Sequence, residues 1–266
     1  MGKLNSPRVV LCDLDGVVWL AHQPIKGSVE AVKRLRDAGT RVIFVTNNSF
    51  STYEQQVAAL EKIGVSARGD VITSAMSAVT ALQPHWRVLL CGGEGLEEEL
   101  TRHGCEVVVA FRERHAAGPF DAVVVGFHRE FDFEVLSDAL TAIRFGAVLV
   151  GSNDDSTYPT PNGPIPGGGA ILAAIAKASG HTPIVTGKPN VPMAEMVSAM
   201  CPGVSIDDMV MVGDRLDTDR AFARTIGCRF ALVLSGVTSE GTTADADIVA
   251  PDLAGIADAL LGKSST

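Results

Sequence analysis

The chain has 266 residues, is 46% hydrophobic and carries a formal net charge of −9 with a sequence pI of about 5.1. This acidity disfavours nucleic acid as a partner, because phosphate backbones select basic surfaces. No apolar run reaches the roughly 18 residues of a membrane span, and no secretory signal is visible, so we expect no membrane association. The five scattered cysteines lack a Cys-x-x-Cys pair, which disfavours zinc and fits a soluble, cytoplasmic protein.

Short apolar runs alternate with helical patterns along the whole chain. The runs have no polar face, as in strands buried on both sides of a parallel sheet. We predict strands at residues 9–12, 42–45, 71–73, 88–91, 106–110, 122–125, 147–150, 184–186, 209–212, 230–234 and 248–250.

Apolar residues at helical spacing, often followed by a glycine, predict the helices between these strands. The predicted helices cover residues 28–38, 52–63, 75–82, 134–144, 170–178, 193–200, 218–227 and 253–261, and a charged helix ends near residue 103. Strand–helix alternation of this kind predicts an α/β fold with a doubly wound, mostly parallel sheet.

The first predicted strand ends abruptly at Asp13, Asp15 and Gly16. A buried strand does not tolerate an unpaired carboxylate, so the two acids are expected at the carboxyl edge of the sheet. Their spacing of two on an extended chain points both side chains to one side, and Gly16 allows a sharp turn after them. Ligands bind at this edge in open α/β sheets.

Three further predicted strands also end in polar groups. These groups are Thr46, Asn47 and Asn48; Lys188; and Asp214, which follows Gly213 and precedes Asp219 by five residues. If all four strands lie in one parallel sheet, their ends converge on one crevice. Crowded carboxylates repel, and a hard divalent cation with oxygen ligands resolves the repulsion, which favours Mg²⁺. A metal, a lysine and small donors together suit a phosphoryl group.

The four polar endings, taken in order, resemble the four motifs of the haloacid dehalogenase-like hydrolases. The stretch from Ser152 to Asp155, with Pro159 and the glycines and proline that follow, resembles the NagD-like branch, which includes p-nitrophenyl phosphate, phosphoglycolate and pyridoxal phosphate phosphatases. That branch carries a large α/β cap. The resemblance implies a Rossmann-like core formed by residues 1–78 and 185–266, with residues 79–184 inserted as the cap.

The resemblance also implies the chemistry. Asp13 would be the nucleophile that forms an aspartyl phosphate, and Asp15 the general acid and base. Mg²⁺ would be held by the side chains of Asp13 and Asp214 and by the main-chain carbonyl of Asp15. Lys188 would neutralise charge on Asp13 and on the phosphoryl group.

The remaining implied site residues would bind the phosphoryl group or the rest of the substrate, or support the residues that do. Phosphoryl oxygens would be bound by Thr46, Asn47 and Asn48. The substrate would be reached from the cap by Asn153, Asp155 and Tyr158. The supporting residues would be Asp219, Gly16 and Gly213. Asp217 either caps the following helix or helps to bind the metal.

A glycine-rich stretch, Gly92, Gly93 and Gly95, lacks the full spacing of a nucleotide loop, so we predict a plain strand-to-helix turn.

These features predict a Mg²⁺-dependent phosphomonoesterase acting on a small phosphorylated metabolite, and on p-nitrophenyl phosphate in vitro. The candidate substrates are a sugar phosphate, glycerol phosphate, phosphoglycolate, a nucleotide monophosphate and pyridoxal phosphate. The alternatives are a phosphotransferase or mutase with the same intermediate, and a non-catalytic phosphate-receiving module. The resemblance also allows a homodimer.

Overall fold

The structure is a computed structural model that describes residues 6–20, 22–158, 160, 162–237 and 246–262. Pro159 of the predicted cap motif lies outside the described residues. The chain forms two compact units: unit 1 comprises Met1–Thr46, Gln56–Ile72 and Ala194–Thr266, and unit 2 comprises Asn47–Gln55 and Thr73–Met193. The division into a core of 1–78 and 185–266 and a cap of 79–184 stays a prediction.

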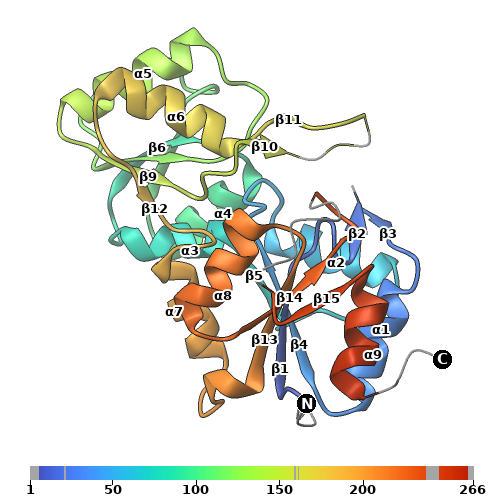
Figure 1. Cartoon of the computed structure of the whole chain (residues 1–266). Coiled ribbons are helices and arrows are strands. Elements are labelled where there is room, and N and C mark those ends of the chain that lie inside the picture. The colour runs from blue at the N-terminus through green and yellow to red at the C-terminus, as the bar shows by residue number, and fades with distance from the viewer. Residues whose placement is uncertain (1–5, 21, 159, 161, 238–245, 263–266) are drawn as a thin grey trace. The chain divides into compact units, whose positions relative to one another are not determined.

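A six-stranded sheet forms the centre of unit 1 (Figure 1). Its order is β15 (Ile248–Ala250), β14 (Arg229–Val233), β13 (Met209–Gly213), β1 (Val9–Cys12), β4 (Arg41–Thr46) and β5 (Val71–Thr73). β1 pairs in parallel with both β13 and β4. All four residues of β1 are buried, as expected for a strand covered on both faces. The predicted α/β fold with parallel sheets is confirmed.

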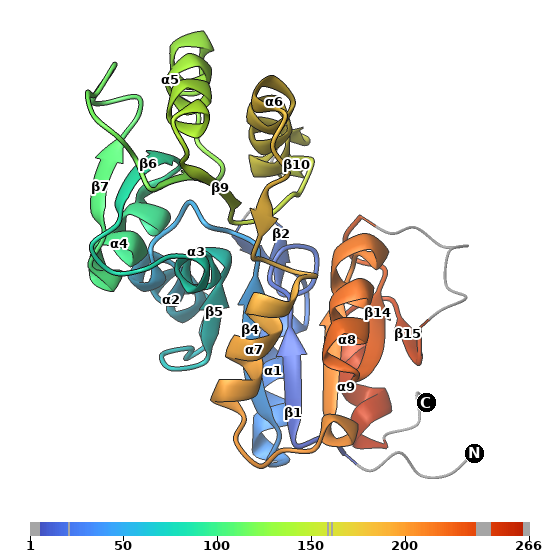
Figure 2. The ribbon, with the colours of Figure 1, turned by 90° about the vertical axis from the view of Figure 1, so that its left-hand side faces the viewer.

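Helices cover this sheet. They are α1 (Ser28–Asp37), α2 (Tyr53–Lys62), α7 (Val191–Met200), α8 (Ala221–Ile226) and α9 (Leu253–Leu261). α1 packs against α9, which also contacts β14 and β15, while α8 contacts β13 and β14 (Figure 2). α2 begins with a capping box, in which Thr52 and Gln55 each accept a hydrogen bond from the other's main-chain N–H. None of the helices described combines the length and apolarity needed to cross a membrane.

Unit 2 contains a five-stranded parallel sheet. Its order is β12 (Ile184–Val185), β9 (Val148–Gly151), β8 (Ala122–Val125), β6 (Arg87–Cys91) and β7 (Glu106–Val109). Successive residues of a strand face opposite sides. Leu89 and Val123 accordingly join one apolar cluster, and Val88 and Val124 join another.

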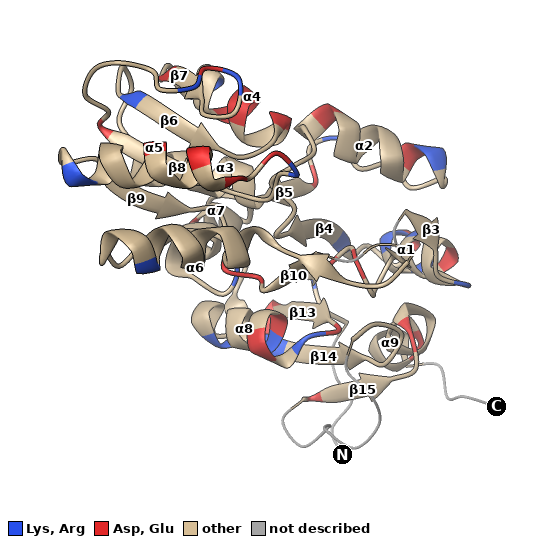
Figure 3. Ribbon diagram, turned by 90° about the horizontal axis from the view of Figure 1, so that it is seen from above, with Lys and Arg blue, Asp and Glu red and all other residues tan. Residues whose placement is uncertain are grey.

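Each cluster is closed by a pair of helices. α5 (Phe133–Arg144) and α6 (Gly168–Ser179) complete the first, and α3 (Ser74–Ala78) and α4 (Glu94–His103) complete the second. A short 3₁₀ helix, Val79–Ala81, follows α3. α6 carries a single charged residue, Lys177, and Figure 3 shows the rest of this helix without charge. Its buried residues include Ile171, Leu172 and Ile175.

The structure corrects the expectation that all four polar strand ends belong to one sheet. β12, the strand that precedes Lys188, pairs with β9 at the edge of the unit 2 sheet. It has only two residues, and Ile184 is 48% exposed, so it does not resemble the long buried strands around β1.

Two short hairpins were not predicted from the sequence. One pairs β2 (Trp19–Leu20) with β3 (Gln23–Pro24), and the other pairs β10 (Thr157–Tyr158) with β11 (Ile165–Pro166). Strands of two residues are too short to show a hydrophobic period. The helix predicted at 218–227 begins earlier, as a π-helical turn over Leu216–Arg220 that leads into α8.

We expect Leu11→Ala to lower the free energy of unfolding by roughly 2–5 kcal/mol, because Leu11 is 0% exposed in the central strand of unit 1. Urea denaturation measures the change. The control Leu20→Ala removes the same atoms from a side chain that is 51% exposed, and should stay within about 0.5 kcal/mol of the unsubstituted chain. Equal losses in both variants would contradict this account of the core.

Candidate functional site

In the unit 1 sheet, successive strands are added in opposite directions on the two sides of its centre. β1, β4 and β5 follow one another to one side, while β13, β14 and β15 follow one another to the other side. The order therefore reverses between β1 and β13, and such a switch point is where open α/β sheets bind ligands. Cys12 pairs with Val212 at this point, and the N–H of Asp13 donates to the carbonyl of Val212 at 2.9 Å.

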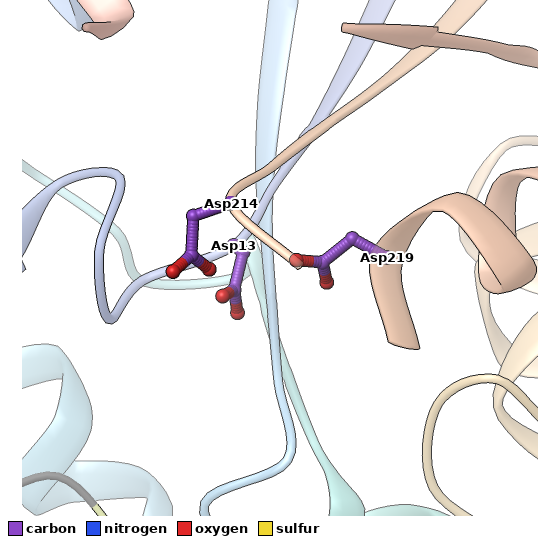
Figure 4. A group of neighbouring side chains, drawn as sticks. All are labelled: Asp13, Asp214 and Asp219. Carbon is purple, nitrogen blue, oxygen red and sulfur yellow. The ribbon is translucent and has the colours of Figure 1, made fainter. Parts of the chain in front are cut away.

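Three carboxylates gather at the carboxyl ends of these two strands. Oxygen atoms of Asp13, Asp214 and Asp219 all lie within 4.8 Å of one another. The residues are 8%, 1% and 0% exposed, respectively. Figure 4 shows the carboxylates of Asp214 and Asp219 on either side of that of Asp13. Three predicted site residues from distant parts of the sequence are thus brought together.

Glycines leave room for this cluster. Gly16 has φ +85°, and a Cβ atom on it would lie 2.5 Å from Oδ2 of Asp214. A Cβ on Gly213 would likewise collide with the carboxylate of Asp219, and one on Gly236 with that of Asp214. Small residues at these positions are therefore a condition for packing the carboxylates side by side.

The segment after β14 also contributes to the cluster, and the sequence analysis missed it. The main-chain N–H of Val237 donates to Oδ2 of Asp214 at 2.7 Å, and the hydroxyl of Ser235 donates to the carbonyl of Gly16 at 2.7 Å. The signal for this segment was Gly236, a glycine just beyond a buried strand.

Asp219 lies in the π-helical turn after β13. Its Oδ2 accepts a hydrogen bond from the main-chain N–H of Arg215 at 3.2 Å, which holds the carboxylate toward the cluster. Asp217, on the same turn, instead pairs with the guanidinium of Arg215 at 3.0 Å. That hydrogen bond lowers the pKa of the Asp217 carboxyl below its ordinary value. Asp217 thus belongs to an exposed ion pair rather than to the carboxylate cluster.

Two other predicted site residues of unit 1, Asp15 and Thr46, lie just after β1 and at the end of β4. Asp15 is half-buried and forms an isolated bridge with Trp19, at the start of the β2–β3 hairpin. Its carboxylate is not one of the three grouped among the described residues. Thr46 is the last residue of β4 and is 3% exposed.

A second group of predicted residues lies in unit 2. The side chain of Asn47 bonds to both main-chain polar atoms of Lys188, and Lys188 itself is 2% exposed. Nδ2 of Asn153 donates to the carbonyl of Asn47 at 2.8 Å. Asp155, which was also predicted from the sequence to reach the substrate, accepts a hydrogen bond from Nδ2 of Asn47 at 3.1 Å.

Asn48 and Tyr158 are also brought together within unit 2. Oδ1 of Asn48 accepts hydrogen bonds from the N–H groups of Phe50 and Ser51, while its Nδ2 donates to the hydroxyl of Tyr158 at 3.3 Å. The ring of Tyr158 stacks on Phe127, with centroids 4.3 Å apart and planes inclined by 9°. Tyr158 is therefore held at both its ring and its hydroxyl.

The glycines after β6 accommodate the segment 47–55. A Cβ on Gly93 would collide with the ring of Phe50, and one on Gly95 would lie 2.7 Å from the carbonyl oxygen of Ser49. The N–H of Gly95 also donates to the carbonyl of Phe50 at 2.8 Å. The stretch is thus a strand-to-helix turn, as predicted, whose glycines admit another part of the chain.

Comparisons with known proteins identify the family of the chain. A model described as haloacid dehalogenase-like hydrolase matches residues 10–106, and a second, HAD-hydrolase-like model matches residues 185–259. A p-nitrophenyl phosphatase from Archaeoglobus fulgidus is 30% identical in sequence, with a TM-score of 0.84 over 96% of this chain and 99% of that one. The chain belongs to the haloacid dehalogenase-like hydrolases.

Two further relatives of this hydrolase are mycobacterial. D-glycerol 3-phosphate phosphatase of Mycobacterium tuberculosis is 39% identical over 235 residues, which cover 86% of this chain and 64% of that protein. The chain thus spans less than two thirds of that relative. A structure of glycerol phosphate phosphatase from the same organism in complex with magnesium is 34% identical, with a TM-score of 0.80 over 96% of this chain and 76% of that one.

The carboxylate cluster of this hydrolase suits a divalent cation. Three buried carboxylates whose oxygens lie within 4.8 Å would repel strongly if all were ionised without a counter-charge. A hard cation with oxygen ligands offsets that repulsion, and Mg²⁺ prefers such ligands. The donor set of Asp13, Asp214 and Asp219 therefore fits magnesium.

We expect Gly16→Ala to weaken Mg²⁺ binding at least about 10-fold in titration calorimetry, because the new methyl group would displace the carboxylate of Asp214. The matched control is Gly39→Ala. Gly39 has φ +87°, close to that of Gly16, but nothing lies within 4 Å of its ideal Cβ. It should lose about 1–2 kcal/mol of unfolding free energy through backbone strain, with unchanged Mg²⁺ affinity. Equal Mg²⁺ affinity in both variants would contradict the steric argument.

Proposed function

We propose that the chain is a Mg²⁺-dependent phosphomonoesterase that acts on a small phosphorylated metabolite. The observation that carries the proposal is the cluster of Asp13, Asp214 and Asp219, buried together at the switch point of a parallel sheet. The phosphatase activities named for the relatives support it.

The metal site proposed here uses the carboxylates of Asp13 and Asp214 and the main-chain carbonyl of Asp15. When bound, the magnesium ion offsets the negative charge of the phosphoryl oxygens. Asp219 supports the site, since its carboxylate belongs to the same cluster and is held by the N–H of Arg215.

The chemistry divides between two carboxyl groups. An oxygen of Asp13 forms a bond to phosphorus while the ester P–O bond breaks, and the carboxylic acid of Asp15 gives its proton to the leaving alkoxide. The ionised Asp15 then takes a proton from water, whose oxygen attacks phosphorus while the bond to Asp13 breaks. Both residues return to their starting states, and inorganic phosphate is released.

The remaining residues bind the substrate. The phosphoryl oxygens accept hydrogen bonds from the hydroxyl of Thr46 and from N–H groups of Asn47 and Asn48, and Lys188 supplies positive charge. Asn153 and Tyr158 contribute to the substrate site from the segment between β9 and α6. Tyr158, stacked on Phe127, would present a fixed ring to the part of the substrate that leaves with the alkoxide.

The proposed substrates are small phosphate esters such as glycerol phosphate and sugar phosphates, with p-nitrophenyl phosphate as the laboratory substrate. Initial rates over a panel of phosphorylated metabolites, ranked by kcat/KM, identify the preferred one. Product analysis with an added acceptor alcohol separates hydrolysis from phosphotransfer. Phosphate release that continues over many turnovers separates an enzyme from a phosphate-receiving module.

We expect Asp13→Asn to reduce phosphate release from p-nitrophenyl phosphate at least about 1,000-fold, because a neutral amide is a poor nucleophile toward phosphorus. The matched control is Asp37→Asn, which makes the same change at an exposed position near the end of α1 and should keep full activity. Circular dichroism checks that both variants fold. Unreduced turnover in Asp13→Asn would refute the covalent mechanism.

We expect EDTA to stop hydrolysis and added Mg²⁺ to restore it, because the clustered carboxylates need a counter-charge before an anionic substrate can approach. The assay follows phosphate release before chelation, after chelation and after repletion. Undiminished turnover after removal of all divalent ions would exclude a metal-dependent reaction.

A further inference from the structure

The side chain of Asn47 bonds to the main chain of Lys188 rather than to its side chain. Oδ1 accepts a hydrogen bond from the Lys188 N–H at 2.8 Å, and Nδ2 donates to the Lys188 carbonyl at 3.1 Å. One primary amide thus pairs with both polar atoms of a single residue, as a neighbouring strand would. This pairing restrains the main chain from which the Lys188 side chain begins.

The orientation of this amide follows from the chemistry of its partners. The second hydrogen of Nδ2 is donated to Oδ2 of Asp155 at 3.1 Å, and an ionised carboxylate only accepts hydrogen bonds. The Lys188 N–H, in contrast, only donates. Rotating the amide by 180° would place oxygen against oxygen and N–H against N–H, so only one orientation satisfies every partner.

The main chain of Asn47 is itself held by side-chain hydrogen bonds. Its carbonyl accepts hydrogen bonds from the hydroxyl of Ser74 at 2.6 Å and from Nδ2 of Asn153 at 2.8 Å. Oδ1 of Asn153 in turn accepts from the N–H of Asp155 at 3.2 Å, which ties the two supporting residues together. All of these groups belong to unit 2.

The approach of the amide also requires a glycine before Lys188. A Cβ on Gly187 would lie 2.7 Å from Oδ1 of Asn47, closer than a carbon and an oxygen normally come. The absence of a side chain at 187 therefore admits the Asn47 amide.

We propose that Asn47 is a positioning residue for Lys188: its side chain fixes the main chain from which the ammonium group extends that is proposed above to supply positive charge. The inference rests on the proposed function. Both N–H groups of the Asn47 side chain are committed to Lys188 and Asp155. The phosphoryl contact proposed for Asn47 therefore falls to its main-chain N–H.

The first test does not depend on activity. In Asn47→Ala the Lys188 N–H loses its acceptor, so its hydrogen exchange, followed by NMR, should become at least about 10-fold faster. The control Asn162→Ala makes the same change at an exposed residue and should leave this exchange rate unchanged. An unchanged Lys188 exchange rate in Asn47→Ala would overturn the inference.

The second test asks whether Asn47 acts through Lys188. We expect Asn47→Ala to lower kcat for p-nitrophenyl phosphate roughly 100-fold, since a small misplacement of a charged group is costly. In a Lys188→Met background, which lacks the ammonium, the same change should lower kcat less than about 3-fold. Independent, multiplying effects would show that Asn47 acts on the substrate directly and would overturn the positioning role.

A second variant keeps the test decisive if Asn47→Ala does not fold. Asp155→Ala removes the carboxylate that accepts from Nδ2 of Asn47 while the Asn47 side chain stays in place, and should accelerate Lys188 exchange by a smaller factor. Asp154→Ala, one residue away and exposed, is its matched control. Unchanged Lys188 exchange in Asp155→Ala would count against the inference.

An unsubstituted chain that releases no phosphate would refute the proposed function, whereas the exchange rates would still decide whether Asn47 holds Lys188.

Discussion

The structure of unit 1 depends on placing three carboxylates side by side where water is largely excluded. Each would be costly to bury ionised and alone. The fold meets this cost locally, with main-chain N–H groups of Arg215 and Val237 directed at Asp219 and Asp214. A small, hard cation would offset the remaining repulsion, which links the stability of this region to the proposed chemistry.

The sequence predicted the long elements well because their physical signals are local. β1, β4 and β13 are continuous apolar runs, and α1 and α9 carry apolar residues at helical spacing, so each could be identified without knowing its neighbours. The assignment of β12 to a sheet failed for the opposite reason. Two residues carry too little hydrophobic pattern to show which sheet they join, and only their pairing with β9 decides it.

In the candidate site, too, residues with a local sequence signal were predicted and those that depend on distant contacts were not. Asp13 and Asp214 were found because each ends a buried strand, a position where a carboxylate is conspicuous. The segment from Ser235 to Val237 was missed, because its contributions are hydrogen bonds to residues distant in sequence. Such contacts leave no period or spacing in a single sequence. Glycines such as Gly236 and Gly187 are the only local trace, since each marks a close approach whose partner the sequence does not name.

Thr46 and Asn47 show why adjacency in sequence is a poor guide to how a site is held. Thr46 ends β4 and is fixed by the unit 1 sheet, whereas Asn47 is fixed by Ser74 and Asn153 within unit 2. The change of unit therefore falls at one peptide bond inside a single polar motif. The residues that follow are anchored to unit 2 as well, since Phe50 and Ser49 pack closely over Gly93 and Gly95. The donors of this motif are thus held in two ways, Thr46 by the pairing of β4 and Asn47 by side-chain hydrogen bonds within unit 2.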